Sequence, residues 1–288
     1  MEREQADTII PFYENPDCSP KEHVKRVSRT LFSVAQLGLH HRVVLVDDGN
    51  SLRGGEINIP NVVVTLKLDS HRGKAGAVRE GIAWVLKNNQ NAEYIIQSDC
   101  DGDPNPRQVR AMLQALIDQD ITGDQPAMVL GERDEALRKH KRFDEHREAL
   151  FSLQNHFCGL LGYPQIVDPT TGLRLYTRKL AETFIALGKA QGFGCDVEQL
   201  IIARLLNAQV IPYKLYDARR RADHTDIAKF QSSQEALMLH SVALQEMGLK
   251  QVVDVFGRVD LMEAEIIEPA GIGIQLKSDG DSLRGVKL

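Results

Sequence analysis

The sequence predicts an α/β fold in which a mainly parallel central sheet is flanked by helices. One observation is that short apolar runs alternate with segments whose apolar residues recur at helical spacing, the pattern of repeated βαβ units. The other is that two of these runs end directly in acidic clusters, Asp47-Asp48-Gly49 and Asp99-Cys100-Asp101. Because ligands of open α/β sheets bind at the carboxyl ends of the strands, the same pattern predicts where a site would lie.

The strand predictions rest on apolar or β-branched runs that are bounded by turn residues. The run 42–46, for example, leads into Asp47-Asp48-Gly49, and the run 94–97 leads into the second acidic cluster. In chain order the predicted strands are 8–12, 42–46, 62–66, 94–97, 127–130, 173–176 and 209–215.

The helix predictions rest on apolar residues three or four positions apart, as at Val78, Ile82 and Leu86. In chain order the predicted helices are 20–38, 75–87, 109–116, 150–157, 197–206 and a C-terminal helix beyond Asp226. The highly charged stretch 132–148 is predicted to form a loop and helix beside the site, and the chain is predicted to fray from Ser278.

Size and composition narrow the class of protein. A chain of 288 residues with 42% hydrophobic and 26% charged residues suits a soluble globular protein of one large α/β domain, or of one domain plus an appendage. A net charge of -5 argues against a general nucleic-acid-binding surface, and four cysteines without a Cys-x-x-Cys pair indicate reduced thiols. No stretch approaches the roughly 20 apolar residues of a membrane span, and the polar N-terminus does not resemble a signal peptide. We therefore expect a cytoplasmic protein with at most peripheral membrane contact.

Three carboxylates after the strand at 94–97 predict a divalent-metal site. Asp99, Asp101 and Asp103 alternate along the chain, so in an extended segment all three point the same way. Clustered carboxylates repel one another unless a cation lies between them, and such a cation would attract a nucleotide diphosphate. A calcium loop is excluded because Pro104 and Arg110 stand where it needs Gly and Glu. A solvated acidic turn remains the structural alternative.

Two further segments suit a phosphorylated ligand. His71-Arg72-Gly73-Lys74-Ala75-Gly76-Ala77 opens a helix with glycines and a lysine, so backbone N–H groups and the charge of Lys74 can meet a phosphate. Asp47 and Asp48 can accept hydrogen bonds from a base and a ribose. Read alone, these segments are equally well a plain helix start and an ordinary Asp-Gly turn.

Taken in order, these motifs resemble the family 2 glycosyltransferases, and most closely the polyprenyl- and dolichyl-phosphate hexosyltransferases. The quoted segments are Ile10-Pro11-Phe12-Tyr13, Val46-Asp47-Asp48-Gly49, Arg72-Gly73-Lys74, Arg79-Glu80-Gly81, Asp99-Cys100-Asp101, Gly131-Glu132-Arg133, Asp168–Tyr176 and Asp196-Val197-Glu198. The chain departs from the family at Glu14-Asn15, where the usual order of the two residues is swapped, and by lacking C-terminal membrane helices.

The resemblance implies a GT-A (Rossmann-like) fold and a hexosyltransferase that uses Mg²⁺ or Mn²⁺ and a UDP- or GDP-sugar. It implies a catalytic domain over 1–225, with a nucleotide-sugar half at 1–130 and an acceptor half at 131–225, and a helical extension over 226–288. The extension is expected to pack on the domain, to mediate a homodimer or to lie on a membrane, and the sequence leaves these possibilities open.

Residue roles carried over from the family are also expectations. Donor-binding residues would be Pro11, Tyr13, Asp47, Asp48, Gly73, Lys74, Asp99, Arg133 and Arg220. Metal ligands would be Asp99, Asp101 and Asp103, and residues of the catalytic step would be Asp101, Asp168, Arg174 and Asp196.

The acceptor remains open at the level of sequence. A lipid phosphate needs no general base, and Arg133, Arg174 or the run 219–221 would hold it, although that run is as readily a solvated charge cluster. A soluble hydroxyl acceptor needs a carboxylate base, for which Asp168 or Asp196 is expected. A non-catalytic module that binds nucleotide sugars is the third alternative. The sugar, the base and the stereochemical outcome are likewise open.

Overall fold

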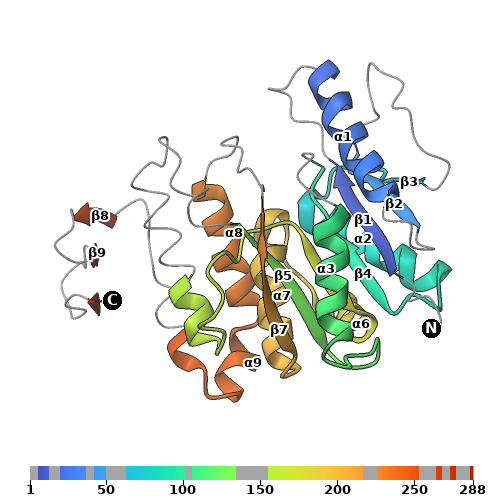
Figure 1. Ribbon diagram of the computed structural model, residues 1–288. Helices are drawn as coiled ribbons and strands as arrows, with labels where there is room; N and C mark the ends of the chain where they lie inside the picture. Colours follow the sequence, from blue (N-terminus) through green and yellow to red (C-terminus); the bar gives the residue numbers. More distant parts are fainter. Residues whose placement is uncertain are drawn as a thin grey trace.

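The computed structural model describes residues 6–12, 20–36, 42–49, 63–100, 106–133, 155–216, 226–252, 264–267, 273–276 and 286–287. Its main sheet has seven strands in the order β3-β2-β1-β4-β6-β5-β7 (Figure 1). The strands are β1 Ala6–Phe12, β2 Val43–Asp47, β3 Val63–Lys67, β4 Tyr94–Gln97, β5 Ala127–Arg133, β6 Arg174–Thr177 and β7 Gln209–Leu215. Only β6 runs antiparallel to its neighbours within this sheet, so the predicted α/β fold with a mainly parallel sheet is confirmed.

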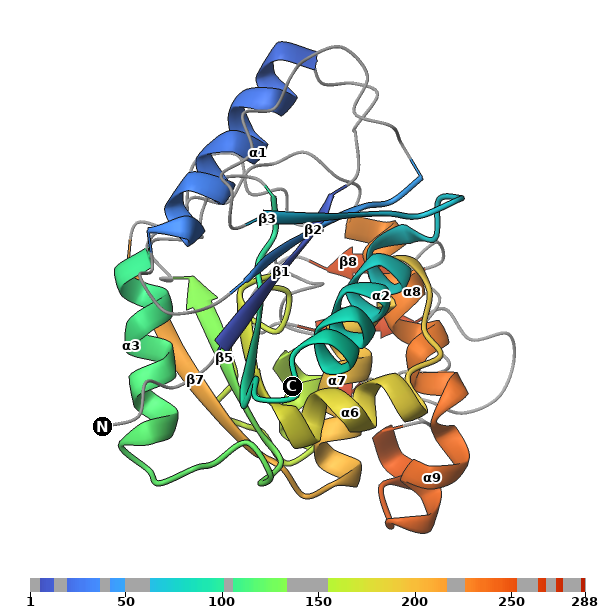
Figure 2. The same cartoon turned by 90° about the vertical axis from the view of Figure 1, so that its right-hand side faces the viewer.

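Helices cover both faces of this sheet (Figure 2). One face carries α1 (Pro20–Ala35) and α3 (Pro106–Ile117). The other carries α2 (Gly73–Asn88), α6 (Arg178–Leu187), α7 (Cys195–Leu205) and α8 (Asp226–Leu239). The short η1 (Gly192–Gly194) precedes α7, and α9 (Ser241–Glu246) follows α8.

The alternation of side chains along β2 shows why its sequence is apolar throughout. Val43 and Leu45 belong to the core beneath α1 and α3, whereas Val44 and Val46 belong to the core beneath α2 and α7. All four are fully buried. Strands that are covered on both faces are continuously apolar, and this strand places Asp47 and Asp48 at the carboxyl edge of the sheet.

Several elements differ from the sequence expectation. The helix α6 begins directly after β6 and was not predicted, because only Leu180, Ala181 and Phe184 form its buried face. A separate three-stranded sheet of β8 (Ala264–Ile267), β9 (Gly273–Leu276) and β10 (Val286–Lys287) was not predicted either. The predicted loop and helix over 132–148 lies mostly outside the described residues.

The strand order also bears on how the two expected halves are joined. The strand β6 comes from the range 131–225 and pairs with β4 on one side and with β5 on the other. Residues from both halves therefore meet within one continuous sheet.

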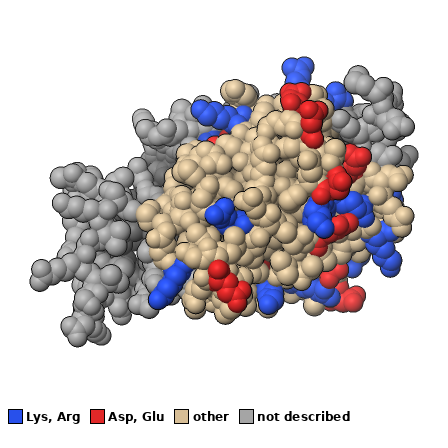
Figure 3. Space-filling view, turned by 90° about the horizontal axis from the view of Figure 1, so that it is seen from below, with Lys and Arg blue, Asp and Glu red and all other residues tan. Residues whose placement is uncertain are grey.

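In the part of the chain that the structure describes, no helix is long and apolar enough to cross a membrane. On the face shown in Figure 3, acidic and basic side chains are interspersed around uncharged surface.

Candidate active site

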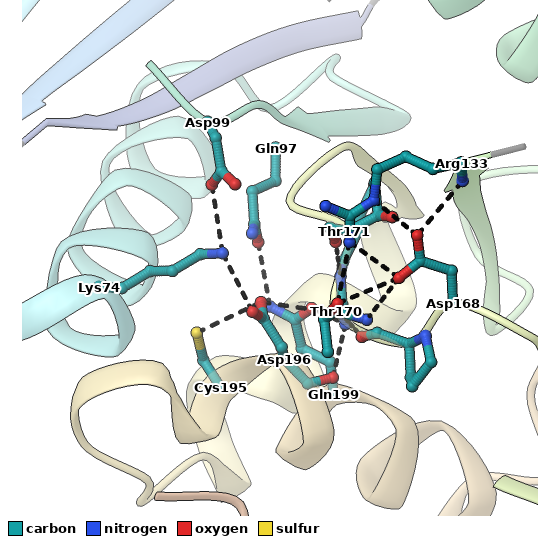
Figure 4. A network of polar contacts seen from close by, with 12 residues as sticks. Lys74, Gln97, Asp99, Arg133, Asp168, Thr170, Thr171, Cys195, Asp196 and Gln199 are labelled. Carbon is teal, nitrogen blue, oxygen red and sulfur yellow. Dashed lines mark hydrogen bonds and ion pairs between the residues drawn. The ribbon is translucent and has the colours of Figure 1, made fainter. Parts of the chain in front are cut away.

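An ammonium group shared by two carboxylates forms the centre of the candidate site (Figure 4). The Nζ atom of Lys74 lies 3.2 Å from Oδ1 of Asp99 and 3.1 Å from Oδ2 of Asp196. Lys74 is in the first turn of α2, Asp99 follows β4, and Asp196 is in the first turn of α7. Three elements that are distant in sequence thus bring their charges together at the carboxyl edge of the sheet.

The ammonium of Lys74 is largely buried and is strongly held in its charged form. Its side chain is 13% exposed. Burial alone would lower the pKa of Lys74, but the charges of Asp196 and Asp99 outweigh burial and raise it. Lys74 is therefore a cation throughout the physiological pH range, and it neutralises part of the repulsion between the two carboxylates.

The residues expected to contact the nucleotide lie beside this centre. Asp47 is the last residue of β2, and its backbone is paired with Phe12, next to the buried Pro11 of β1. The carboxylate of Asp48 accepts a hydrogen bond from the backbone N–H of Arg72 at 2.7 Å and lies 2.7 Å from Nδ1 of His71. Asp48 thus fastens the loop that leads into Gly73 and Lys74. Gly73 has a φ of +70°, a conformation that favours glycine at this helix start.

The carboxylate of Asp99 lies where a side chain at position 172 would be. A Cβ atom on Gly172 would stand 1.9 Å from Oδ2 of Asp99. The loop before β6 therefore leaves room for this carboxylate only because residue 172 is glycine. The glycine of the 168–176 segment is visible in the sequence, but nothing in the sequence pattern indicates that it lies next to Asp99.

Asp168 forms a bidentate ion pair with Arg133. Nε of Arg133 lies 2.6 Å from Oδ2 of Asp168, and Nη2 lies 2.9 Å from Oδ1. Burial would raise the pKa of Asp168, but the charge and hydrogen bonds of Arg133, together with the hydrogen bond from Thr170, lower it to about 2. Asp168 is an anion whose two oxygens are both occupied, so this geometry suits anchoring the loop better than accepting a proton from a substrate.

The guanidinium of Arg174 is fully buried and makes its hydrogen bonds within the protein. It donates to the carbonyl oxygens of Thr171 and Asp196, at 3.0 and 2.7 Å, and to that of Pro169 at 2.5 Å. It also donates to Oε1 of Gln199 at 2.7 Å. Arg174 thus ties the 168–172 loop to the start of α7 and is placed to position Asp196.

A buried amide pair extends this network beneath the site. Nε2 of Gln199 donates to Oε1 of Gln97 at 3.1 Å, and the hydroxyl of Tyr176 donates to the same oxygen. Gln97 precedes Asp99 by two residues at the end of β4, and both appear in Figure 4 beside Lys74. Sequence reasoning missed Gln97 and Gln199, because lone glutamines carry no motif.

The structure therefore brings Lys74, Asp99 and Asp196 together, and it places Arg133, Asp168 and Arg174 in the adjoining support. Four of the expected site residues lie outside the described residues: Tyr13, Asp101, Asp103 and Arg220.

The carboxylate oxygens at this edge of the sheet are suitable ligands for a divalent cation. Asp99 has a side chain that is 39% exposed and supplies carboxylate oxygens, the ligands that Mg²⁺ and Mn²⁺ prefer. The missing side chain at Gly172 leaves the space that this carboxylate occupies. Within the described ranges, no three acidic, histidine or cysteine side chains gather around one point, and the two other expected ligands, Asp101 and Asp103, lie outside these ranges.

Comparison with known proteins identifies sequence relatives. Residues 7–184, more than half of the chain, match the model of glycosyl transferase family 2. The dolichyl-phosphate beta-glucosyltransferase of Homo sapiens is 25% identical over 178 residues, which cover 59% of this chain and 53% of that protein. The undecaprenyl-phosphate 4-deoxy-4-formamido-L-arabinose transferase of Photorhabdus laumondii is 27% identical over 187 residues, covering 63% and 51% of the two chains. The chain thus spans about half the length of these relatives.

Solved structures share the fold at low sequence identity. Glucosyl-3-phosphoglycerate synthase from Mycobacterium tuberculosis, in complex with Mn²⁺, UDP-glucose and phosphoglyceric acid, has a TM-score of 0.57 at 15% identity, covering 83% of this chain and 80% of that one. Mannosyl-3-phosphoglycerate synthase from Rubrobacter xylanophilus has a TM-score of 0.57 at 14% identity, covering 94% and 85%. These similarities confirm the predicted GT-A type of fold.

Proposed function

Since the chain belongs to glycosyl transferase family 2, we propose that it is a metal-dependent, inverting hexosyltransferase. The donor would be a UDP- or GDP-hexose and the acceptor a polyprenyl-phosphate-type lipid. The observation that carries the proposal is the ammonium of Lys74 shared by Asp99 and Asp196, since it joins the expected donor and acceptor halves at one point. The names of the two sequence relatives support the acceptor class.

On this proposal, the donor binds along the carboxyl ends of β1, β2 and β4. Asp47 receives the base or ribose, and Asp48 acts mainly by holding the loop at His71 and Arg72. Asp99, with Asp101 and Asp103, would hold Mg²⁺ or Mn²⁺. When bound, such a cation stabilises the negative charge that gathers on the departing diphosphate. The Mn²⁺ and UDP-glucose named for one structure of the same fold support this assignment.

The chemical step exchanges one bond for another at the anomeric carbon. An oxygen of the acceptor phosphate forms the new bond to that carbon, and the bond to the diphosphate oxygen breaks with its electron pair leaving on the diphosphate. A phosphate oxygen is already anionic at neutral pH, so no general base is needed. Lys74 lies where it can hold the diphosphate, and Arg174 keeps Asp196 in place beside it.

Transfer to a soluble hydroxyl acceptor is the second candidate. A hydroxyl must lose its proton as it attacks, and Asp196 is the best-placed base because Asp168 is already bound by Arg133. Phosphoglyceric acid, a small molecule that carries a hydroxyl group, is named in the complex of one structure of the same fold, and this supports the second candidate. Parallel transfer assays with dolichyl phosphate in vesicles and with 3-phosphoglycerate would separate the two candidates.

Other assignments accompany the proposal. We assign residues 1–225 to the catalytic domain and 226–288 to an extension, whose described part contains the strands β8, β9 and β10 in addition to the expected helices. A lipid-phosphate acceptor would bring the protein to the cytoplasmic face of a membrane as a peripheral protein. A homodimer through the extension remains a prediction, which size-exclusion chromatography with light scattering tests.

Slow donor hydrolysis tests the proposed activity without knowledge of the acceptor. The protein is incubated with UDP-glucose or GDP-mannose and Mn²⁺, and released sugar is measured. We expect Asp99→Asn to abolish release and Asp118→Asn, an exposed carboxylate on the turn after α3, to leave it unchanged. Metal-dependent donor binding without release or transfer in any of the assays would identify a non-catalytic nucleotide-sugar-binding module instead.

A further inference from the structure

A buried contact between His240 and Glu198 links the C-terminal helices to the acceptor side of the candidate site. His240 lies between α8 and α9 and is 6% exposed. Its Nε2 atom lies 2.9 Å from Oε1 of Glu198, which is fully buried in the first turn of α7. Both residues lie beyond the segment that matches the family model, and a lone histidine carried no signal in the sequence.

Glu198 joins several segments rather than capping its own helix. Its Oε1 atom also accepts hydrogen bonds from the backbone N–H groups of Lys189, at 2.6 Å, and of Ala190, at 2.8 Å. Nη1 of Arg79 in α2 lies 3.9 Å from Oε2 of Glu198 and donates to the carbonyl of Ala190 at 2.5 Å. Burial would raise the pKa of Glu198, but the hydrogen bonds from His240, Lys189 and Ala190 outweigh it and lower the pKa. Glu198 is therefore a buried anion that depends on its donors.

This anion is close to the candidate catalytic carboxylate along the chain. Asp196 precedes Glu198 by two residues in the same helical turn, and the loop 189–194 leads directly into that turn. The backbone of α8 lies against this loop, because a Cβ atom on Gly194 would stand 2.5 Å from the carbonyl oxygen of Ser232. The loop thus lies against α8 at Gly194 and is held at Lys189 and Ala190 by a carboxylate that His240 fixes.

We propose that His240 is a positioning residue of the transferase. Through its hydrogen bond to Glu198 it fixes the 189–194 loop and the first turn of α7, and through them the place of Asp196 next to Lys74. The proposal rests on the proposed function for its effect on catalysis, but the structural link itself does not. It gives the helices α8 and α9 a role within the active site rather than that of an appendage.

Three variants test the role. His240→Leu removes the donor, His240→Gln retains an N–H donor at a similar reach, and Leu244→Ala creates a cavity in the same helical pair without touching Glu198. Leu244 is fully buried, so its truncation lowers stability through packing alone. Hydrogen exchange of the amides of Lys189 and Ala190 reports on Glu198 directly, because their partner is its carboxylate.

We expect these two amides to exchange at least about tenfold faster in His240→Leu than in Leu244→Ala. In His240→Gln, most of the wild-type protection against exchange should be retained. In donor hydrolysis and in transfer to a hydroxyl acceptor, where Asp196 would act as the base, kcat should fall roughly tenfold to a hundredfold in His240→Leu. The donor KM should change by less than about threefold, because the substitution lies outside the donor half. Leu244→Ala should keep its kcat at temperatures where it remains folded.

Equal exchange and equal kcat in His240→Leu and Leu244→Ala would overturn the proposal, since His240 would then act only through stability. A fall in donor affinity as large as the fall in kcat would also contradict it. If the wild-type protein neither hydrolyses nor transfers any donor, the proposed function fails, and the exchange measurement alone still decides whether His240 holds the loop.

Discussion

Replacement of Gly172 by alanine should weaken metal-dependent donor binding while leaving the fold intact. The added Cβ atom would lie 1.9 Å from Oδ2, 2.0 Å from Cγ and 2.3 Å from Oδ1 of Asp99. Ordinary contacts begin near 3.4 Å, so the carboxylate must move by about 1.5 Å. The colliding atoms are the end of one side chain, and rotation of Asp99 relieves the overlap without moving the backbone.

The two consequences of this movement differ in size. Asp99 would lose its ion pair with Lys74, and because its side chain is 39% exposed, solvent screening limits that loss to about 1 kcal/mol or less. Displacing a binding group by about 1 Å costs on the order of a hundredfold when the group must meet a ligand with defined geometry. We therefore expect the free energy of unfolding to change by at most about 1 kcal/mol, whereas Mn²⁺-dependent donor affinity falls tenfold or more, about 1.4 kcal/mol.

Isothermal titration of UDP-glucose and GDP-mannose, each with and without Mn²⁺, measures the affinity, and urea unfolding measures the stability. Gly159→Ala is the matched control, because a Cβ atom there meets no described atom within 4 Å. Wild-type donor affinity in Gly172→Ala would refute the reasoning, since Asp99 would then contribute nothing from the position that the structure gives it.

Three other substitutions test the support of the site. Asp168→Asn should lower the free energy of unfolding in urea by about 2 kcal/mol at pH 7, because Arg133 lowers the pKa of Asp168 from 3.8 to about 2. The stabilisation by the Asp168 carboxylate is complete above about pH 4 and is lost as the pH falls toward 2, so the variant and the wild type should become equally stable there. Arg174→Lys should lower the free energy of unfolding by roughly 3 kcal/mol in the same measurement, since one ammonium cannot reach the acceptors that the buried guanidinium serves. Asp196→Asn should lower kcat about 10²- to 10⁴-fold with a hydroxyl acceptor and far less with a phosphate acceptor, and parallel transfer assays would show no such difference if Asp196 were not the base.

The site residues that could be predicted from the sequence are those that lie at the ends of predicted strands. Asp47, Asp48 and Asp99 each follow a recognisable apolar run, and parallel strands bring such residues to one edge without any knowledge of distant contacts. Lys74 could be predicted for the same reason, because its helix start follows the next strand along the chain. These predictions need only the local pattern of residues and a general property of α/β sheets.

The remaining part depends on tertiary contacts that leave no local pattern. Arg174 is predicted to be a phosphate ligand because a guanidinium binds phosphate oxygens well, but β6 is inserted between β4 and β5 and buries this side chain completely. Asp168 is predicted as a possible base because its partner cannot be seen in the sequence. That partner is Arg133 at the end of β5, 35 residues away. The role of His240 could not be predicted from the sequence, since it depends entirely on a tertiary contact with the carboxylate of Glu198.

The charge balance of the described cluster explains why donor and metal should bind together. Asp99 and Asp196 carry two negative charges. Lys74 and Arg174, whose Nη2 atom lies 3.7 Å from Oδ1 of Asp196, carry two positive charges, so these four groups sum to zero. The cluster alone therefore offers a diphosphate no net attraction, whereas a divalent cation on Asp99 would make the sum of charges positive. Lys74 belongs to the helix after β3 and Asp196 to the helix before β7. On the proposed function, the ammonium that binds the diphosphate is therefore the one that also holds the acceptor-side carboxylate. Any movement of Lys74 toward the donor must therefore release Asp196 from its ion pair, and the donor and acceptor sides of the site are linked through a single side chain.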